Sequence, residues 1–269
     1  MRIGVLSDLH REIAPVGSRW LNAFATERLD EMTDDALEWF SSARIDLLLV
    51  LGDVIQIPDS RDLEHVFSRL TRADIAPLFA VNGNHDVRLG ADFAAIARAH
   101  GVGLLYEERF ELEGVEFSGV EIARGSKLPQ YVGTACAAGS EAGIVVVASH
   151  FPLLSEAARV AGAGIPYAGD LANRADLEAH YTADPRPKLV LSGHIHARCT
   201  TDEGSLLQFV VGAVIEPPYD ATIVEIDPTA LLVRRTSRRL GSVAAFDPVF
   251  TGDEESWRWV ERWEATSLG

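Results

Sequence analysis

Short apolar runs rich in valine, isoleucine and leucine recur along the chain, and each gives way abruptly to polar residues or glycine. These runs cover residues 2–7, 46–51, 77–81, 144–149 and 188–191. A short run that is apolar at successive positions, not only at alternate ones, is typical of a strand covered on both faces. The pattern therefore predicts five buried strands.

Helical patterns separate the first three runs. Thr33 is a candidate N-cap for a helix over residues 34–43, and Ser60 begins a second helical segment over residues 61–71. A hydroxyl at such a position can accept a hydrogen bond from a free N–H of the first turn. Residues 91–100 are expected to form a third helix. This alternation of strand and helix predicts a largely parallel, layered sheet.

Beyond the third helix the pattern changes to short stretches of alternating hydrophobicity, which are typical of strands with one exposed face. Such stretches cover residues 109–112, 115–120, 206–211, 221–226 and 231–235, and we expect them to form a second sheet. Residues 254–265 carry apolar side chains at roughly helical spacing and are expected to be a helix. The predicted architecture is a two-sheet sandwich flanked by helices, of the α/β (layered α+β) class.

Length and composition are those of one globular domain. The 269 residues, 47% hydrophobic and 24% charged, contain no evident linker, so we expect a single domain over residues 1–269. Three regions, residues 11–25, 123–142 and 155–184, resist assignment. Connections of this length in a compact domain are commonly binding loops.

Charge narrows the range of partners. A formal net charge of -16 repels polyanions and argues against broad docking on nucleic acid or anionic membranes. The first residues turn polar too soon for a secretion signal, and no apolar run approaches the ~18 residues of a membrane span. We expect a cytoplasmic protein whose two cysteines, Cys136 and Cys199, are reduced thiols.

Potential metal ligands follow almost every predicted buried strand. They are Asp8, His10, Asp53, Asn84, His85, His150, His194 and His196. Because the carboxyl ends of parallel strands meet at one edge of a layered sheet, we expect these residues to converge. Carboxylate, imidazole and amide ligands together suit Mn, Fe, Zn or Co better than Ca.

The histidines are concentrated in these motifs. Of the eight in the chain, only His65, His100 and His180 lie elsewhere, two within predicted helices and one at a helix C-terminus. A helix-borne histidine without neighbouring ligands is usually packed or solvated. We therefore expect these three to have structural roles.

Five blocks of the sequence resemble the ordered motifs of the calcineurin-like metallophosphoesterase superfamily. They are Asp8-x-His10, Gly52-Asp53, Gly83-Asn84-His85-Asp86, His150 and Gly193-His194-x-His196. The blocks extend from residue 8 to residue 196 and hence over most of the chain. The fold that the resemblance implies, a pair of sheets between helices, agrees with the hydrophobic pattern.

The resemblance also implies a ligand set for two divalent transition metal ions, Mn, Fe or Zn. One ion would be held by Asp8, His10 and His196, the other by Asn84, His150 and His194, and both by Asp53. A hydroxide that bridges the ions would be the nucleophile. The positive charge of the ions would attract a phosphate ester to an acidic protein.

Four further residues are candidates for catalysis or substrate binding. By the resemblance, His85 would protonate the leaving oxygen or stabilise the transferring phosphate. Asp86 would orient His85, with a turn or helix cap as its alternative role. Arg11 and Arg88 each follow a motif directly and are possible phosphate clamps, although surface arginines are common.

Two departures from the superfamily pattern argue against a protein phosphatase that acts on phosphoserine or phosphothreonine. No further aspartate follows Asp53 in the segment Val54-Ile55-Gln56, and Asp86 stands where protein phosphatases usually have glutamate. We expect hydrolysis of a phosphomonoester or phosphodiester of a small molecule. The alternatives are a nuclease of the same superfamily, which the net charge disfavours, and a catalytically silent binding module, which the complete ligand set disfavours.

Overall fold

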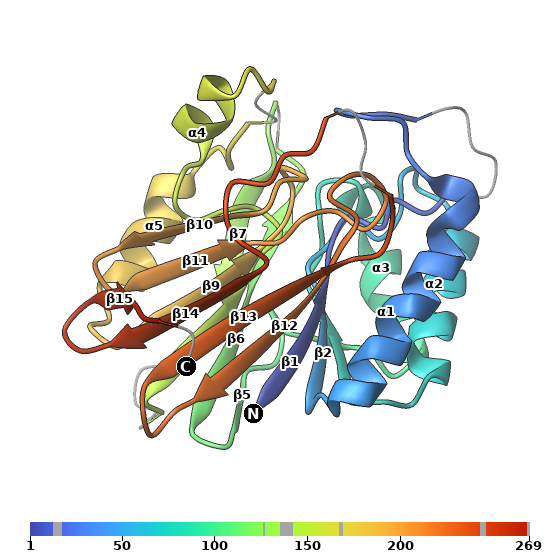
Figure 1. The fold of residues 1–269 in the computed structure, drawn as a ribbon. Coiled ribbons are helices and arrows are strands. Elements are labelled where there is room, and N and C mark those ends of the chain that lie inside the picture. The colour runs from blue at the N-terminus through green and yellow to red at the C-terminus, as the bar shows by residue number, and fades with distance from the viewer. Residues whose placement is uncertain (13–17, 126, 135–141, 167–168, 243–245, 268–269) are drawn as a thin grey trace.

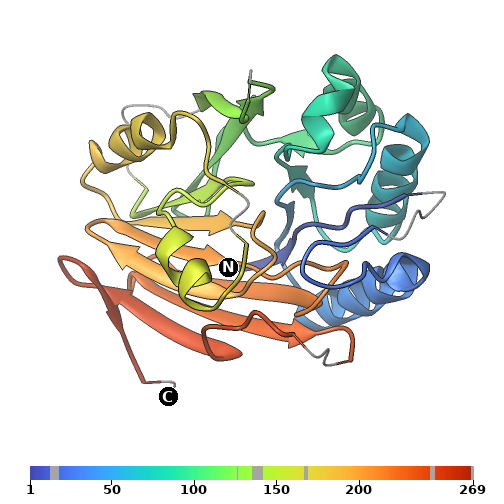
Figure 2. The same ribbon diagram turned by 90° about the horizontal axis from the view of Figure 1, so that it is seen from above.

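Two mixed sheets face each other, and helices cover the outer face of each (Figures 1 and 2). The structure is a computed structural model that describes residues 1–12, 18–125, 127–134, 142–166, 169–242 and 246–267. The predicted class and the two-sheet sandwich flanked by helices are confirmed.

The first sheet has the order β15-β14-β13-β12-β1-β2-β3-β4. Strands β1 to β4 are parallel, whereas β12 pairs antiparallel with β1 and continues into an antiparallel half. The strands are β1 (Arg2–Leu6), β2 (Leu47–Val50), β3 (Leu78–Ala80), β4 (Gly103–Leu104), β12 (Asp220–Asp227), β13 (Leu232–Arg239), β14 (Glu254–Trp259) and β15 (Trp263–Ala265).

The second sheet has the order β10-β11-β9-β8-β6-β5, with β7 also paired to β6. Its centre, β11-β9-β8-β6, is parallel, and its edges are antiparallel. The strands are β5 (Phe110–Leu112), β6 (Val115–Ala123), β7 (Gln130–Thr134), β8 (Ile144–Ala148), β9 (Lys188–Ser192), β10 (Cys199–Glu203) and β11 (Leu206–Val210).

Alternate residues of the inner strands pack into two different apolar cores, one on each face of the sheet. In β1, Ile3 and Val5 belong to the apolar layer between the two sheets. Gly4 faces the opposite way, and a Cβ there would meet Phe40 of α1 and the neighbouring Ile45. Because a strand alternates its side chains, apolar residues at every position fill both layers, which explains the continuous apolar runs of the sequence.

Helices α1 (Leu29–Ala43), α2 (Ser60–Arg72) and α3 (Ala91–Ala99) cover the outer face of the first sheet, and α5 (Arg174–Thr182) lies on the other side of the sandwich (Figure 2). The short helices are α4 (Ala157–Gly162), η1 (Thr26–Arg28) and η2 (Asp86–Leu89). None of the described helices is both long enough and apolar enough to cross a membrane.

Two predicted helix starts need correction. Thr33 lies inside α1, where its hydroxyl donates to the carbonyl oxygen of Leu29, and the buried side chain of Leu29 extends the helix by one turn before it. In α2 the N-cap is Asp59, whose carboxylate accepts from the N–H of Arg61. The predicted third helix is confirmed as α3.

The predicted division of strands between the sheets was wrong in two respects, and one predicted helix is a hairpin. Strands β8 and β9 belong to the second sheet, and β12 and β13 to the first. Residues 254–265, expected as a helix, form the hairpin of β14 and β15, since Trp257 and its neighbours pair with β13. Local patterns predict that a segment is extended, but backbone pairing with a distant segment decides its sheet.

The sequence contains an arginine cluster, Arg234, Arg235, Arg238 and Arg239. We expect such charges on an edge strand, where they discourage pairing, but the cluster lies on β13, which pairs with β12 on one side and β14 on the other. Arg235 is buried, 3.1 Å from the carboxylate of Glu255. The cluster therefore includes a neutralised internal cation, whereas Arg234 and Arg238 are exposed.

Candidate metal centre

Loops from both sheets meet at one end of the sandwich. The first sheet contributes the segments that follow β1, β2 and β3, and the second contributes those that follow β8 and β9. Backbone hydrogen bonds join these loops: the N–H of Asp8 donates to the carbonyl oxygen of Gly52 over 3.2 Å, and that of Gly193 donates to His150 over 3.0 Å. The predicted convergence of the motifs is therefore produced by two facing sheets and not by one.

The backbone at the predicted ligands is unusual. Asp8, His10, Asp53, His194 and His196 all have positive φ, between 44° and 70°. This region is unfavourable for residues with a Cβ and costs about 1–2 kcal/mol for each residue. Such conformations persist where the surrounding structure holds them, and they concentrate at functional sites.

Three of the predicted ligands enclose one point. The Nε2 atoms of His10 and His196 lie 3.1 Å apart, and Oδ1 of Asp8 lies 3.3 Å from Nε2 of His196. The other oxygen of Asp8 accepts from the hydroxyl of Ser7 and the N–H of His194. Oδ1 has no hydrogen-bond partner among the described residues although it is buried. An unpartnered carboxylate oxygen beside two imidazole nitrogens is a fitting donor set for a cation.

Asp53 lies between this group and a second one. Its Oδ2 is 3.6 Å from Nε2 of His10 and 3.3 Å from Nε2 of His150. Its Oδ1 accepts from the N–H of His85 over 2.8 Å. On the far side of His150, Oδ1 of Asn84 lies 3.1 Å from the same Nε2. One oxygen of Asp53 thus faces both groups.

His194 is held differently from the other predicted ligands. It is absent from the three compact groups of potential ligand atoms found among the described residues, which are Asp8, His10 and His196; His10, Asp53 and His85; and Asp8, Asp53 and His150. Its ring packs at 5.1 Å from the His150 ring, and its Nε2 lies 3.2 Å from the carbonyl oxygen of Gly169. Nδ1 is the nitrogen left available for a metal ion.

Electrostatics in the centre are dominated by buried carboxylates. Burial disfavours a charged His196, but Asp8 and Glu216 outweigh it and raise the pKa of His196 to about 10. Against the effect of burial, Asp53 and Asp8 raise the pKa of His150 to about 9. His150, His10 and His85 hold the pKa of Asp53 well below its ordinary value, although burial opposes the shift. The carboxylates are therefore ionised and available to bind cations.

The two remaining ligand imidazoles are neutral. Burial lowers the pKa of His10 to about 3, and burial together with the adjacent His150 lowers the pKa of His194 to about 3. A neutral imidazole retains the lone pair that a metal ion requires.

His85 is oriented by a carbonyl group. Its Nδ1 lies 2.7 Å from the carbonyl oxygen of Gln56, which turns Nε2 toward the centre, 3.9 Å from Oδ2 of Asp53. The ring is partly exposed. The His85 side chain is therefore not fully enclosed by the protein.

The prediction that Asp86 orients His85 needs correction, because the group at Nδ1 of His85 is the carbonyl oxygen of Gln56. The Asp86 carboxylate is buried and accepts from the N–H groups of Gly83, Val54 and Ile55. Burial, reinforced by the charge of Asp53, raises its pKa to about 7. Asp86 joins the loops after β2 and β3, which agrees with the alternative expectation of a turn-capping role.

Glu216 was missed by the sequence analysis. It is buried, its Oε1 lies 2.6 Å from Nδ1 of His196, and its Oε2 accepts from the N–H of Asn22 over 2.6 Å. A carboxylate on the outer nitrogen of a ligand imidazole fixes the ring and increases its basicity. The available signal was an acidic residue at the end of the largely apolar run 206–215.

The two candidate phosphate clamps differ in their surroundings. Arg11 forms ion pairs with Asp30 and Asp62, at 3.0 and 3.5 Å, because its side chain extends toward α1 and α2. Arg88 is exposed and lines a cavity of about 470 Å³, here called the side cavity, together with Pro58, Asn84, Val87, Arg124, Gly125, Lys127, Leu128, Pro129, Phe151 and His194. Of the two, Arg88 adjoins the centre in a solvent-accessible space.

Aromatic residues of the loop after β1 lie over the opposite side of the centre. The ring of Phe24 is 5.2 Å from that of His10, and the ring of Trp20 is 6.3 Å from that of His196. Cys136 lies outside the described residues. Cys199 is a buried free thiol in β10.

Comparisons with known proteins agree with this geometry. Residues 1–198 match the model of the calcineurin-like phosphoesterase family. The fold is similar to that of a dimetal phosphatase from Danio rerio, with a TM-score of 0.63 and 15% identity over 89% of this chain and 96% of that one.

A protein of Thermus thermophilus has a similar fold, with a TM-score of 0.53 and 13% identity over 89% of this chain and 99% of that one. No protein of curated function matches the chain in sequence. The family match covers more than half of the chain and includes every predicted metal ligand. The chain therefore belongs to the calcineurin-like phosphoesterase family, whose members are metal-dependent phosphoesterases.

Proposed function

We propose that this protein hydrolyses a monoester or diester of phosphate with a small organic molecule, using two divalent transition metal ions. The observation that supports this most is the position of Asp53, whose Oδ2 faces His10 on one side and His150 on the other. A carboxylate oxygen shared between two ligand groups suits a dinuclear site.

The described residues divide into two ligand sets. Asp8, His10 and His196 would hold one ion, and Asn84, His150 and His194 would hold the other, with Asp53 as the shared ligand. When bound, two divalent ions supply positive charge for the phosphate and a water nucleophile that is available at neutral pH. That charge offsets the net negative charge of the protein where the substrate binds.

His85 is the proposed general acid. Its Nδ1–H can stay on the carbonyl oxygen of Gln56 while Nε2 faces the centre. The protonated ring would donate its Nε2–H to the departing oxygen of the ester, and the alcohol would leave neutral. Arg88, at the rim of the centre, would contact the substrate rather than a metal ion.

Metal content and hydrolysis test the proposal together. Protein reconstituted with Mn should contain two ions per chain, hydrolyse p-nitrophenyl phosphate or bis(p-nitrophenyl) phosphate, and lose that activity on chelation. Asp53→Asn should reduce both metal content and activity, because the amide lacks the charge needed to neutralise two ions. Asp202→Asn, at an exposed position of β10, is the matched control and should change neither. One ion per chain in active enzyme would refute the dinuclear arrangement.

The two alternatives predict different results in the same assay. A silent binding module would bind Mn without turnover of either ester. A nuclease would cleave single-stranded or duplex DNA faster than the small esters. The net charge of -16 weighs against a polyanionic substrate, and two of the β13 arginines, Arg235 and Arg239, are paired with carboxylates.

A further inference from the structure

The side cavity is cationic in an acidic protein. Arg88, Arg124 and Lys127 line it with exposed side chains, and it reaches Asn84 and His194 of the candidate metal centre. Lys127 is one of two lysines in the whole chain, and the other, Lys188, is buried. Three cations therefore surround a solvent-accessible space next to the centre.

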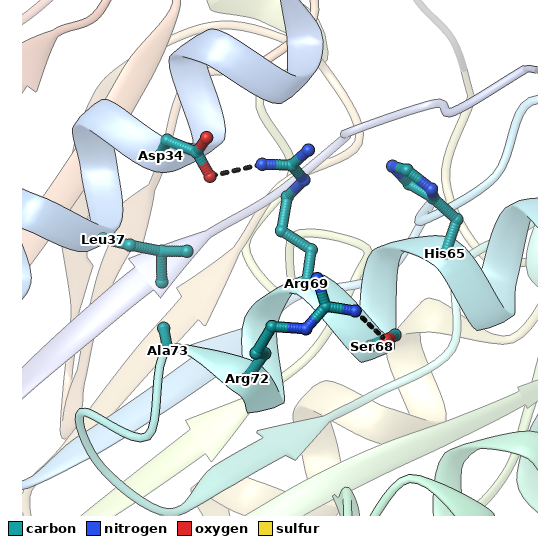
Figure 3. Close-up of a pocket in the computed structure, with 7 residues that line it drawn as sticks. All are labelled: Asp34, Leu37, His65, Ser68, Arg69, Arg72 and Ala73. Atoms are coloured by element: carbon teal, nitrogen blue, oxygen red, sulfur yellow. Dashed lines mark hydrogen bonds and ion pairs between the residues drawn. The ribbon is translucent and has the colours of Figure 1, made fainter.

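These three cations are unlike most others in the protein. Among the described residues, none of the three has an ion pair, whereas many arginines pair with a carboxylate, such as Arg98 with Glu107. Another pocket that contains arginines, between α1 and α2, shows arginines that have partners (Figure 3). There Arg69 points to Asp34 and Arg72 to Ser68.

Part of the lining of the side cavity is apolar. Val87, Leu128, Pro129 and Phe151 lie around it, and the side chain of Leu128 is 44% exposed. Carbon atoms of a ligand can cover such residues favourably. The lining thus combines a surface for a carbon skeleton with unpaired cations.

From this arrangement we propose that the substrate carries a second phosphate group, which binds to Arg88, Arg124 and Lys127 while the scissile phosphate lies at the metal centre. An unpaired arginine can bind phosphate through two charge-assisted hydrogen bonds. The second group would also explain how an acidic protein retains a small anion with its reacting end correctly placed. This inference rests on the proposed function, because it assumes that the centre binds the scissile phosphate.

Matched pairs of esters test it. The probes are bisphosphates of short straight-chain diols of increasing length, each compared with the monophosphate of the same diol, with Mn-loaded protein. For at least one chain length, kcat/KM for the bisphosphate should exceed that for the monophosphate about tenfold or more, the usual size of charge-assisted contacts. Added salt should reduce this preference, because the cations are exposed.

Two variants test whether the side cavity causes the preference for the bisphosphate over the monophosphate. In Arg124→Gln/Lys127→Gln the ratio of the two kcat/KM values should fall close to one. Arg72→Gln, an exposed arginine of the pocket in Figure 3, is the control and should keep the wild-type ratio. A wild-type ratio near one at every chain length, with both esters hydrolysed, would overturn this inference alone. If neither ester were hydrolysed under any metal condition, the proposed function would fall together with it.

Discussion

At the scale of single residues, the outer nitrogens of three imidazoles have a partner that decides where the inner nitrogen points. His150 has the carbonyl oxygen of Leu51, His196 the carboxylate of Glu216, and His85 the carbonyl oxygen of Gln56. In each ring Nε2 is then the atom that faces the centre. Such partners fix both tautomer and orientation, and a site is preorganised by them before any metal ion binds.

Glu216→Gln should lower the affinity for Mn by roughly 10- to 100-fold, the usual effect of removing a carboxylate behind a ligand histidine. Titration of the metal-free protein measures this directly. Glu203→Gln, at an exposed position of β10, should retain wild-type affinity. If Glu216→Gln also retained it, the role of Glu216 would be limited to holding the N–H of Asn22.

His85→Ala should retain both metal ions but lower kcat by roughly 10²- to 10⁴-fold, because a proton donor is lost and no ligand is removed. The loss should be smaller for aryl than for alkyl phosphates, since p-nitrophenolate leaves readily without a proton. Kinetics on an aryl and an alkyl ester, with metal analysis, provide the test. Equal losses on both esters would make His85 a phosphate-binding residue, and loss of metal would make it a ligand.

At the scale of elements, the strand-end loops approach each other so closely that glycine is required. A Cβ on Gly83, which follows β3, would overlap the backbone nitrogen and the carboxylate of Asp53 after β2. A Cβ on Gly193, which follows β9 of the second sheet, would overlap Ser7 and Asp8 of the first. The glycines of the motifs are thus part of the packing that brings the carboxylates to the centre.

Gly83→Ala should therefore displace Asp53, reduce Mn content and lower the free energy of unfolding by about 1–3 kcal/mol, as overpacking does. Chemical denaturation and metal analysis of the same preparation measure both effects. Gly162→Ala is the matched control, because a Cβ at this helical position meets nothing within 4 Å. It should leave metal content unchanged and alter stability by about 1 kcal/mol or less. A stable Gly83→Ala protein with full metal content would contradict this account of the loops.

At the scale of the whole molecule, the candidate centre is one of the places where polar groups join the two sheets. Asp8 of the first sheet accepts from the N–H of His194 of the second, and His150 lies against the carbonyl oxygen of Leu51. Ions that bind to ligands from both sheets would add a connection between the halves of the sandwich. Metal binding is then expected to stabilise the fold as well as to support catalysis.

Saturating Mn should raise the Tm of the metal-free protein. At 100 times Kd the stabilisation is ~2.7 kcal/mol, which corresponds to roughly 5–10 °C for a protein of this size. Thermal unfolding with and without Mn measures the shift, and Asp53→Asn should show little of it. The same Tm with and without Mn would show that Mn does not bind preferentially to the folded protein.

The sequence alone was sufficient for the family, for its metal-dependent phosphoesterase class and for the class of fold. Ligand residues at strand ends, such as Asp8 and His150, were visible because apolar runs end abruptly just before them. Their order matched the family motifs, and buried strands with such ends imply convergence whichever sheet they join. Metal-dependent phosphoesterase activity and the two-sheet sandwich followed from these local patterns.

Only the tertiary structure decided which groups bind the outer nitrogens of the histidines in the centre. It also decided which cations among the described residues have no ion pair. Glu216, Gln56 and the lining of the side cavity are distant in sequence from the residues that they contact. The assignment of strands to the two sheets and the ion pair between Arg11 and Asp30 also depend on contacts between distant segments. These facts depend on pairings between distant segments, which no local periodicity encodes, because each is selected by the packing energy of the whole chain.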